Sequence, residues 1–361
     1  MNRILATYRI TASESESQVR AEALAAEQSV EMPVGAIDDA HVLTDILAEV
    51  VTIRPHAGEF DVVLAIAPAT TGNEAGQLVN MLFGNCSLQP EVQLVDVEFP
   101  EGYEAAFTGP RFGIEGIRKL VDAPTRPLTC TALKPQGLPP ERLAKLALTF
   151  ATAGIDVIKD DHGIANQAYA PFAQRVPAVQ RAIAQANKAT GGSTVYAPTF
   201  SGGPRALAEQ VKVAHGEGVK MALVAPMLIG LPAFVDLQQE LAMPVMAHPA
   251  FAGAARIAPA VLLGKLFRLF GADATIFPNH GGRFSYSKAS CLAVTEAARA
   301  PWNGLRATLP VPAGGMTVER VPEMITGYGN DTMLLIGGGL LSAKDHLLDR
   351  SREFVACVKA S

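Results

Sequence analysis

The chain is poor in cysteine and has no surplus of positive charge. Its 361 residues include only four cysteines, which lie far apart and form no CxxC pair. This spacing argues against a zinc knuckle or a disulfide framework, and predicts buried, reduced thiols in a cytoplasmic protein. The formal net charge of −5 argues against a nucleic-acid partner, because such proteins usually carry a basic surplus or stripe.

Long apolar runs are also missing. No stretch reaches the roughly 18 apolar residues of a membrane-spanning helix, and the first residues lack the basic-then-apolar pattern of a signal peptide. We therefore expect neither a membrane span nor a membrane partner. The 49% of hydrophobic residues is nevertheless enough to bury a large core, which excludes a disordered chain.

The second two-thirds of the sequence alternates short apolar runs with longer, alanine-rich, helix-like stretches. Near-continuous apolar strands alternating with helices are typical of a parallel sheet that is covered on both faces. Eight such units in residues 121–361 predict a closed (β/α)8 TIM barrel rather than an open sheet. The eight predicted strands are 127–133, 155–160, 194–200, 220–228, 244–250, 274–279, 307–315 and 332–339.

The first 120 residues have a different pattern and predict a separate domain. Apolar, β-rich runs alternate here with only a few helix-like segments, which indicates a small α+β domain of the ferredoxin-like type over residues 1–120. The predicted strands are 4–10, 61–68 and 94–100, and the predicted helices are 17–29 and 73–84.

Polar residues follow several of the predicted barrel strands at their carboxyl ends, where barrel enzymes carry out their reactions. Lys134 follows the first strand, the run from Lys159 to His162 closes the second, and His248 lies at the end of the fifth. Because strand side chains alternate, Lys159 and Asp161 should point into the barrel mouth and Asp160 away from it. Carboxylates beside a lysine and an imidazole favour a hard divalent cation such as Mg²⁺. The competing interpretation is that these charges merely reach solvent.

Glycines cluster after the seventh and eighth predicted strands. Such clusters let backbone N–H groups approach an anion, and the loops after these two strands often bind phosphate in this fold. The alternative is that the glycines only permit tight turns. The candidate phosphate-binding residues are Gly314, Gly315, Gly337 and Gly338.

Several motifs, in order along the chain, resemble the RuBisCO large-chain superfamily. The segment GIDVIKDDHG resembles the strand that carries a carbamylated lysine, and ALKPQGLPPE resembles the strand-1 motif with its proton-transfer lysine. MPVMAHPAF is similar to the strand-5 segment with an active-site histidine. LPVPAGG and LLIGGGLL resemble the two phosphate-binding segments, and AAEQS and FGNC resemble first-domain segments that reach a neighbour's active site.

The resemblance implies a role for each matching residue. Lys159 would be a catalytic lysine that CO₂ converts to a carbamate ligand of Mg²⁺, with Asp161 as a second ligand. Lys134 would be the acid or base, and His248 would contact the substrate. Glu27 and Asn85 would complete the site of a partner subunit, which implies a homodimer or a higher multiple of dimers.

The departures from the family pattern indicate a RuBisCO-like protein that does not fix CO₂. His162 stands where the family has a glutamate ligand, and an imidazole can also bind a metal ion. Pro249 replaces an arginine, and the loop PNHGGRF offers His280 and Arg283 but no lysine to stabilise a carboxylated intermediate. Three further family positions are altered, at Gln136, Ala252 and Ala313.

The resemblance implies an enzyme that enolises a small phosphorylated keto compound with the help of a metal ion. We favour a 5-methylthioribulose 1-phosphate isomerase, because His162 sets the chain apart from the related diketo-methylthiopentyl phosphate enolases. One alternative is a decarboxylase, or a transcarboxylase with hydrolase activity, that acts on a 3-oxo sugar-acid phosphate of the 3-oxo-isoapionate 4-phosphate type. Another is a non-catalytic relative that only binds a phosphorylated ligand.

Overall fold

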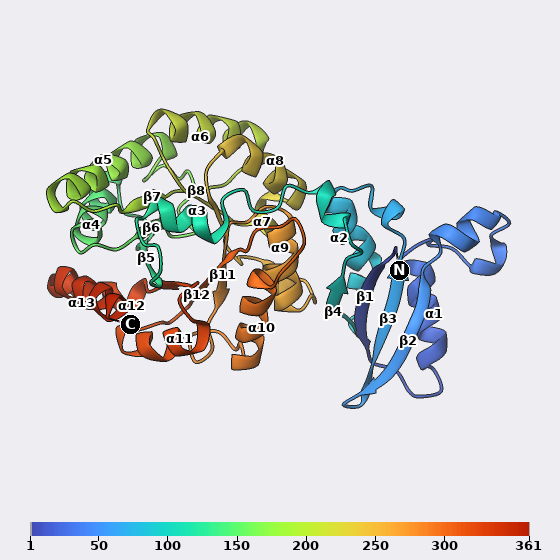
Figure 1. Ribbon diagram of the computed structural model, residues 1–361. Coiled ribbons are helices and arrows are strands. Elements are labelled where there is room, and N and C mark those ends of the chain that lie inside the picture. The colour runs from blue at the N-terminus through green and yellow to red at the C-terminus, as the bar shows by residue number, and fades with distance from the viewer. Residues whose placement is uncertain (1, 361) are drawn as a thin grey trace.

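The computed structural model describes residues 2–360, which form an N-terminal α+β unit and a barrel (Figure 1). The N-terminal unit is a four-stranded antiparallel sheet in the order β2-β3-β1-β4, with two helices. The order β-α-β-β-α-β along the chain confirms the ferredoxin-like type. Its elements are β1 (Ile4–Ile10), α1 (Ser17–Glu27), β2 (Glu49–His56), β3 (Glu59–Ile66), α2 (Ala75–Phe83) and β4 (Val92–Glu98).

Alternation along β1 explains how this sheet packs. Ile4, Ala6, Tyr8 and Ile10 are buried and the residues between them are only partly so, as expected of a sheet with one covered face. The Tyr8 hydroxyl donates a hydrogen bond to the Leu82 carbonyl in α2 at 2.6 Å, which ties that helix to the sheet. The sequence did not predict β2, because this edge strand is largely exposed and lacks an alternating apolar signal.

The barrel contains the eight predicted strand positions, each shorter than its apolar run. Two parallel arcs, β13-β5-β6-β7 and β12-β11-β10-β9-β8, make up its wall. The third predicted strand is divided into β7 and β8 by Pro198, which has no N–H for the ladder. The strands are β5 (Leu128–Leu133), β6 (Val157–Asp160), β7 (Val195–Ala197), β8 (Thr199–Phe200), β9 (Ala222–Val224), β10 (Val245–Ala247), β11 (Ala274–Pro278), β12 (Leu309–Ala313) and β13 (Met333–Leu335).

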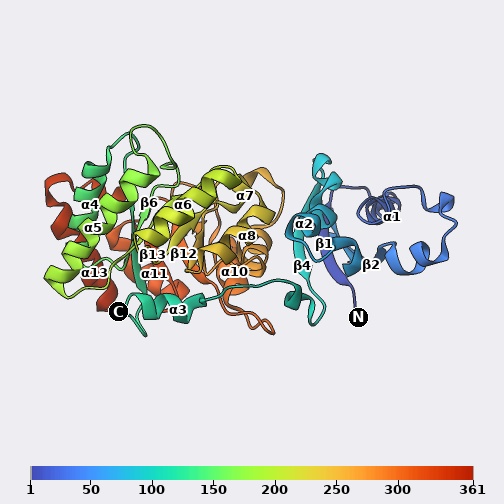
Figure 2. The same cartoon turned by 90° about the horizontal axis from the view of Figure 1, so that it is seen from above.

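Helices surround these strands, as the two ribbon views show (Figures 1 and 2). They are α4 (Pro140–Thr152), α5 (Phe172–Thr190), α6 (Pro204–Gly216), α7 (Pro226–Ile229), α8 (Leu231–Leu241), α9 (Phe267–Leu269), α10 (Lys288–Arg299), α11 (Val321–Tyr328), α12 (Gly338–Leu341) and α13 (Leu347–Lys359). A π-helical segment, Ala260–Leu266, runs directly into α9. Within residues 2–360, no helix combines the length and apolarity that crossing a membrane requires.

The two units are joined along β4. Main-chain hydrogen bonds link Leu94 to the barrel segment at Arg256 and Ala258, at 3.0 and 2.8 Å. The Arg256 guanidinium donates to three carbonyls at Ser87, Gln89 and Val92. These contacts fix the first unit against the barrel of the same chain.

The bottom of the barrel, at the amino ends of the strands, is filled with apolar side chains and closed by α3 (Gly113–Leu120). Ile117 and Val121 belong to a buried cluster that also contains Leu128 and Val157. The carboxylate of the buried Asp273 accepts the main-chain N–H groups at the start of α3, both at 2.7 Å. The predicted domain division after residue 120 falls at the end of this helix, and it stays a prediction.

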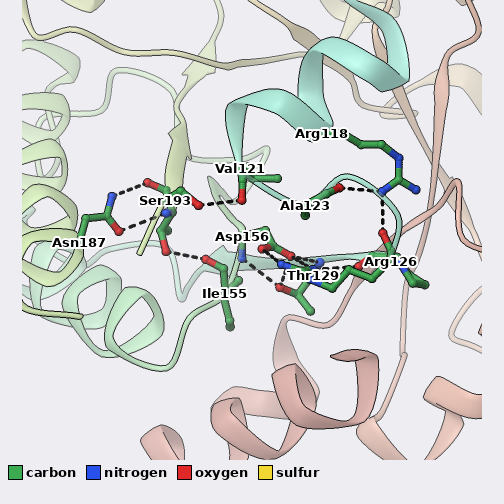
Figure 3. Close-up of polar contacts among 11 residues, drawn as sticks. Arg118, Val121, Ala123, Arg126, Thr129, Ile155, Asp156, Asn187 and Ser193 are labelled. Carbon is green, nitrogen blue, oxygen red and sulfur yellow. Dashed lines mark hydrogen bonds and ion pairs between the residues drawn. The ribbon is translucent and has the colours of Figure 1, made fainter. Parts of the chain in front are cut away.

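A hydrogen-bond network at the same end centres on Asp156 (Figure 3). Its buried carboxylate accepts the Thr129 N–H and hydroxyl, both at 2.8 Å, and the Arg126 guanidinium at 2.6 and 2.8 Å. The Ser193 hydroxyl donates to the Val121 carbonyl at 2.7 Å, which connects the segment just before β7 to the residue that follows α3. The network joins the starts of β5, β6 and β7 far from the barrel mouth.

We therefore predict that Asp156→Ala lowers the free energy of unfolding by about 2–4 kcal/mol, because it leaves buried donors at Thr129 and Arg126 without an acceptor. Urea unfolding measures this change. Asp349→Ala is the matched control: it removes an exposed carboxylate that pairs with the exposed Arg352, and should cost less than about 1 kcal/mol. Equal stability losses in the two variants would contradict the assigned role of Asp156.

Candidate active site

A cavity of about 890 Å³ opens at the carboxyl ends of the barrel strands. It brings together predicted site residues from β6 and from the loops after five strands, β5, β6, β10, β12 and β13. Those that line it are Lys134, Lys159, Asp161, His162, His248, Gly314, Gly315, Gly337 and Gly338. Residues up to 204 positions apart in the sequence therefore line one cavity, because parallel strands bring their carboxyl ends to the same face of the barrel.

Strand β6 determines which charges face this cavity. Lys159 and Asp161 line it, whereas the carboxylate of Asp160 points into the barrel wall. There it contacts Arg175 Nε at 3.1 Å and accepts the Tyr196 hydroxyl at 2.7 Å and the Thr199 N–H at 3.0 Å. The alternation predicted from sequence therefore gives each of the two adjacent aspartates its own environment.

Two lysines and one carboxylate form the polar floor of the cavity. Lys134 Nζ lies 2.5 Å from Asp161 Oδ1. Burial alone would raise the pKa of the Asp161 carboxyl, but His162, Lys134 and Lys159 together hold that pKa well below its usual range. Lys159 is 3% exposed, and its ammonium donates to the Asp160 carbonyl at 3.0 Å. Burial lowers the pKa of the Lys159 amine, which favours the neutral form that reacts with CO₂.

The two histidines of the site are stacked on one another. The His162 and His248 rings are 4.2 Å apart between centroids and are inclined by 11°. His248 Nδ1 accepts the Ala250 N–H at 3.1 Å, which requires this nitrogen to be unprotonated. Burial, with the charges of Lys159 and His162, lowers the pKa of His248 to about 2. His248 is therefore a neutral imidazole throughout the pH range in which the enzyme would work.

The side chains at the end of β6 fit a divalent cation only if Lys159 is carbamylated. Within residues 2–360, no three His, Cys, Asp or Glu side chains converge as a metal-binding group. Asp161 and His162 lie side by side, with Nδ1 of the imidazole 3.5 Å from Oδ1 of the carboxylate. A carbamate on Lys159 would supply a third, anionic oxygen ligand, since Lys159 lines the same cavity as Asp161.

The glycine loops after β12 and β13 both line the cavity, but neighbouring side chains cover them to different degrees. Gly314 and Gly315 have φ angles of 88° and 89°, which side-chain-bearing residues rarely adopt. An added Cβ at Gly338 would meet no atom within 4 Å, so nothing covers this backbone at the start of α12. A Cβ added at Gly314 would lie 3.0 Å from Phe284, and one added at Gly315 would lie 3.0 Å from Arg283 Cγ, so these residues cover the loop after β12. The loop after β13, at Gly338, has the open backbone that an anion-binding site needs.

Glu27 and Asn85 are not part of this cavity. Asn85 lies on the surface of the N-terminal unit, where its amide donates to Glu27 at 2.9 Å and to Glu31 at 2.8 Å. The structure describes a single chain, and a contribution of these residues to a partner's site stays a prediction. His280, whose imidazole lies 3.7 Å from Glu323, does not line the cavity either.

The sequence did not identify the apolar and cationic side chains that complete the cavity wall. These come from the loops after β10, β11 and β12, and are Phe251, Arg283, Phe284, Tyr286 and Met316. Phe251 and Phe284 are 64% and 51% exposed, which is unusual for large apolar side chains. Two exposed aromatics beside a predicted site would have signalled a ligand surface, but their exposure cannot be read from the sequence.

Comparison with known proteins places this fold and site in one family. Residues 113–282 match the family described as ribulose bisphosphate carboxylase large chain, catalytic domain. The chain is 52% identical to the 5-methylthioribulose-1-phosphate isomerase of Rhodospirillum rubrum, over 99% of this chain and 96% of the relative. It is 50% identical to the ribulose bisphosphate carboxylase-like protein 1 of Rhodopseudomonas palustris, over 98% and 97% of the two chains.

A solved structure agrees with these relatives. The crystal structure of a Rubisco-like protein from Rhodopseudomonas palustris is 49% identical and superposes with a TM-score of 0.93, covering 99% of this chain and 98% of that one. The chain therefore belongs to the RuBisCO large-chain superfamily, as one of its RuBisCO-like proteins.

The neutral state of His248 predicts a pH dependence of stability. Because the pKa of His248 is lowered on folding, the unfolded chain binds a proton below about pH 6.5 that the folded chain does not bind. The free energy of unfolding should therefore fall as the pH falls from 6.5 towards 2. In His248→Asn, which keeps an acceptor near Ala250, this fall should be less steep by up to about 1.4 kcal/mol per pH unit.

Urea unfolding at pH 6.5, 5.5 and 4.5 tests this linkage. His41→Asn, at a side chain that is 70% exposed, controls for the loss of an imidazole from the chain. A wild-type slope in His248→Asn would show that His248 takes up its proton in the folded protein.

Proposed function

We propose that this protein isomerises 5-methylthioribulose 1-phosphate, through proton removal next to the ketone and proton return at a neighbouring carbon. One observation carries this proposal: half of the residues, over almost the whole chain, are shared with the isomerase of Rhodospirillum rubrum. The cavity supports it, because lysine and histidine side chains, two glycine loops and an apolar wall are all present there.

The metal ion implied by the family would be held by Asp161, His162 and a carbamate on Lys159. Once bound, Mg²⁺ would stabilise the negative charge that develops on the enediolate oxygens of the substrate. The low pKa of Asp161 supports this assignment, since it keeps the carboxylate ionised as a ligand. The buried amine of Lys159 supports it as well, since CO₂ adds only to a neutral amine.

Proton transfer falls to Lys134. It is the cavity lysine that is one-third exposed, so it can meet the substrate, whereas Lys159 is buried. As the free amine, Lys134 would take the proton from the carbon next to the ketone. As the resulting ammonium, held at the cavity floor by Asp161, it would return that proton to the neighbouring carbon of the enediolate. His248 stands across the mouth, after β10, and its neutral imidazole can hydrogen-bond a substrate hydroxyl without adding charge.

The wall formed by Phe251, Phe284, Tyr286 and Met316 suits the methylthio end of the substrate. Thioethers make favourable contacts with aromatic rings, and apolar burial adds about 0.8 kcal/mol per methylene-sized group. The same loops explain the expected loss of carboxylation. Pro249 and the loop after β11 provide no lysine that could stabilise a newly formed carboxylate.

The assembly we propose is a homodimer or a multiple of dimers, in which each N-terminal unit completes the partner's site. The pair formed by Asn85 and Glu27 supports this, because it is a surface cluster outside its own chain's cavity. Its two polar side chains are held together and are available to a neighbouring molecule.

The direct test is turnover of 5-methylthioribulose 1-phosphate in D₂O with Mg²⁺ and bicarbonate, followed by proton and phosphorus NMR. We expect an isomeric phosphate with deuterium at the newly protonated carbon. Lys134→Met should slow the reaction by about 100-fold or more, the usual contribution of a positioned acid or base. Lys145→Met, at an exposed lysine on α4, is the matched control and should leave the rate unchanged.

Two outcomes would count against the proposal. Release of CO₂ from a 3-oxo sugar-acid phosphate, without turnover of the methylthio sugar, would favour the decarboxylase. Binding of phosphorylated ligands without deuterium exchange in any of them would favour a non-catalytic relative.

Phe251 allows the apolar wall to be tested without loss of stability. Its φ of 68° lies in the left-handed region, so Phe251→Gly removes backbone strain while it deletes the ring. We predict a KM for 5-methylthioribulose 1-phosphate that is about 5- to 30-fold higher, corresponding to a lost apolar contact of about 1–2 kcal/mol. Thermal unfolding should show equal or greater stability, and an unchanged KM would remove Phe251 from the substrate surface.

A further inference from the structure

The cavity has a polar side and an apolar side. The barrel order puts β5 and β10 on opposite sides of the mouth, with β6 to β9 between them one way and β11 to β13 the other way. Lys134 follows β5, whereas the loop that follows β10 and His248 is apolar. Four residues of that loop line the cavity without a charged or hydrogen-bonding side chain, namely Pro249, Ala250, Phe251 and Gly253. Arg283, from the loop after β11, has its stem over Gly315 on the β12 side.

Phe251 is both exposed and strained, which the fold itself does not require. Its ring is largely exposed, and its φ lies in the left-handed region that side-chain-bearing residues rarely adopt. An exposed ring forgoes the stabilisation that burial would give, and strained backbone persists mainly at functional sites. Phe284, from the neighbouring loop, is also exposed and lines the same cavity. Two such rings indicate a ligand with an apolar part.

Nothing closes the apolar wall beyond Phe251. A Cβ added to Gly253 would meet no atom within 4 Å, and the neighbouring Ala254 is exposed. The cavity volume of about 890 Å³ lies near the top of the range of roughly 300–1,000 Å³ that is typical of pockets for drug-sized ligands. A five-carbon sugar phosphate with a methylthio group is smaller than such a ligand. The cavity therefore leaves apolar space beyond the methyl group.

We infer that the cavity also accepts 5-alkylthioribulose 1-phosphates whose sulfur carries a chain longer than methyl, such as ethyl, propyl or butyl. This inference rests on the proposed function and widens its substrate class. Each added methylene that leaves water for the apolar wall should strengthen binding about fourfold. The reaction is unchanged, because the proton leaves and returns at carbons next to the ketone, and Lys134 lies across the mouth from the wall.

Binding of unreactive analogues tests this without relying on turnover. The probes are 5-alkylthioribitol 1-phosphates with methyl, ethyl, propyl and butyl chains, which lack the ketone and cannot be enolised. Isothermal titration of the full-length protein, with Mg²⁺ and bicarbonate present, gives Kd for each probe. We expect Kd to fall about fourfold with each methylene, or about 16-fold from methyl to propyl. A Kd that stays constant or rises with chain length would overturn the inference.

Variants of the wall test where the chain lies. Gly253→Leu would fill the space beyond Phe251, so the fall of Kd with chain length should disappear or reverse. Phe251→Gly removes part of the wall and should make the same fall shallower. Gly216→Leu is the matched control, because it changes another exposed glycine, on α6, whose added Cβ would also meet no atom within 4 Å. It should keep the wild-type progression. A wild-type progression in both wall variants would contradict the assignment of the chain to the loop after β10.

The outcomes separate this inference from the proposed function. A fourfold progression among the analogues supports the inference even if 5-methylthioribulose 1-phosphate is not isomerised, in which case the proposed reaction alone fails. Isomerisation of the methylthio sugar together with weaker binding of the longer chains would overturn the inference and leave the proposed reaction intact. Absence of binding for all four probes would also overturn it.

Discussion

The buried ion pair between Arg175 and Asp160 is the contact on which the reaction site depends most. Both side chains are fully buried, with Nε and Oδ2 3.1 Å apart. Removing either partner would lower the free energy of unfolding by several kcal/mol, because it leaves an unpaired buried charge. The Arg175 guanidinium also donates to the carbonyls of Ala165 and Ala170, so it holds the loop that follows β6. With Asp160 fixed outward, Lys159 and Asp161 have to face the cavity.

This arrangement divides the barrel into a stable end and a reactive end. At the amino ends of the strands, α3 and the carboxylates of Asp156 and Asp273 satisfy the backbone donors around an apolar core. At the carboxyl ends, two lysines, one carboxylate and two imidazoles lie within one cavity. Grouping charges at the mouth lowers the stability of the fold. The close packing of the remainder of the barrel, with its buried carboxylates paired, offsets this loss.

Much of the fold was predictable from the sequence, because it rests on local patterns. Eight apolar runs predict the barrel strands. The alternation of side chains along β6 predicts that Asp161 faces the cavity and that Asp160 faces away from it. The sequence also pointed to Lys134, His248 and the two glycine clusters, since barrel strands bring their carboxyl ends together. The edge strand β2 was not predicted, since its exposed side chains carry no periodic signal.

The rest of the site depends on long-range packing that no local pattern encodes. The stacking of His162 on His248 brings together residues 86 positions apart, from loops on different strands. The position of Arg283 depends on the contact of its stem with Gly315. The aromatic wall depends on the exposure of Phe251 and Phe284. Arg283 was noticed in the sequence only as part of a loop that lacks a lysine. Its proximity to Gly314 and Gly315 depends on the fold and cannot be read from the sequence.

The central claim is that Lys159, Asp161 and His162 form a metal site once Lys159 carries CO₂. Carbon-13 NMR of the protein with labelled bicarbonate and Mg²⁺ tests it most directly, by detecting a carbamate carbon. We expect a carbamate signal that depends on Mg²⁺, that disappears in Lys159→Met and that persists in Lys134→Met. A signal of equal strength in Lys159→Met, or no signal in the wild-type protein at saturating Mg²⁺ and bicarbonate, would contradict this account.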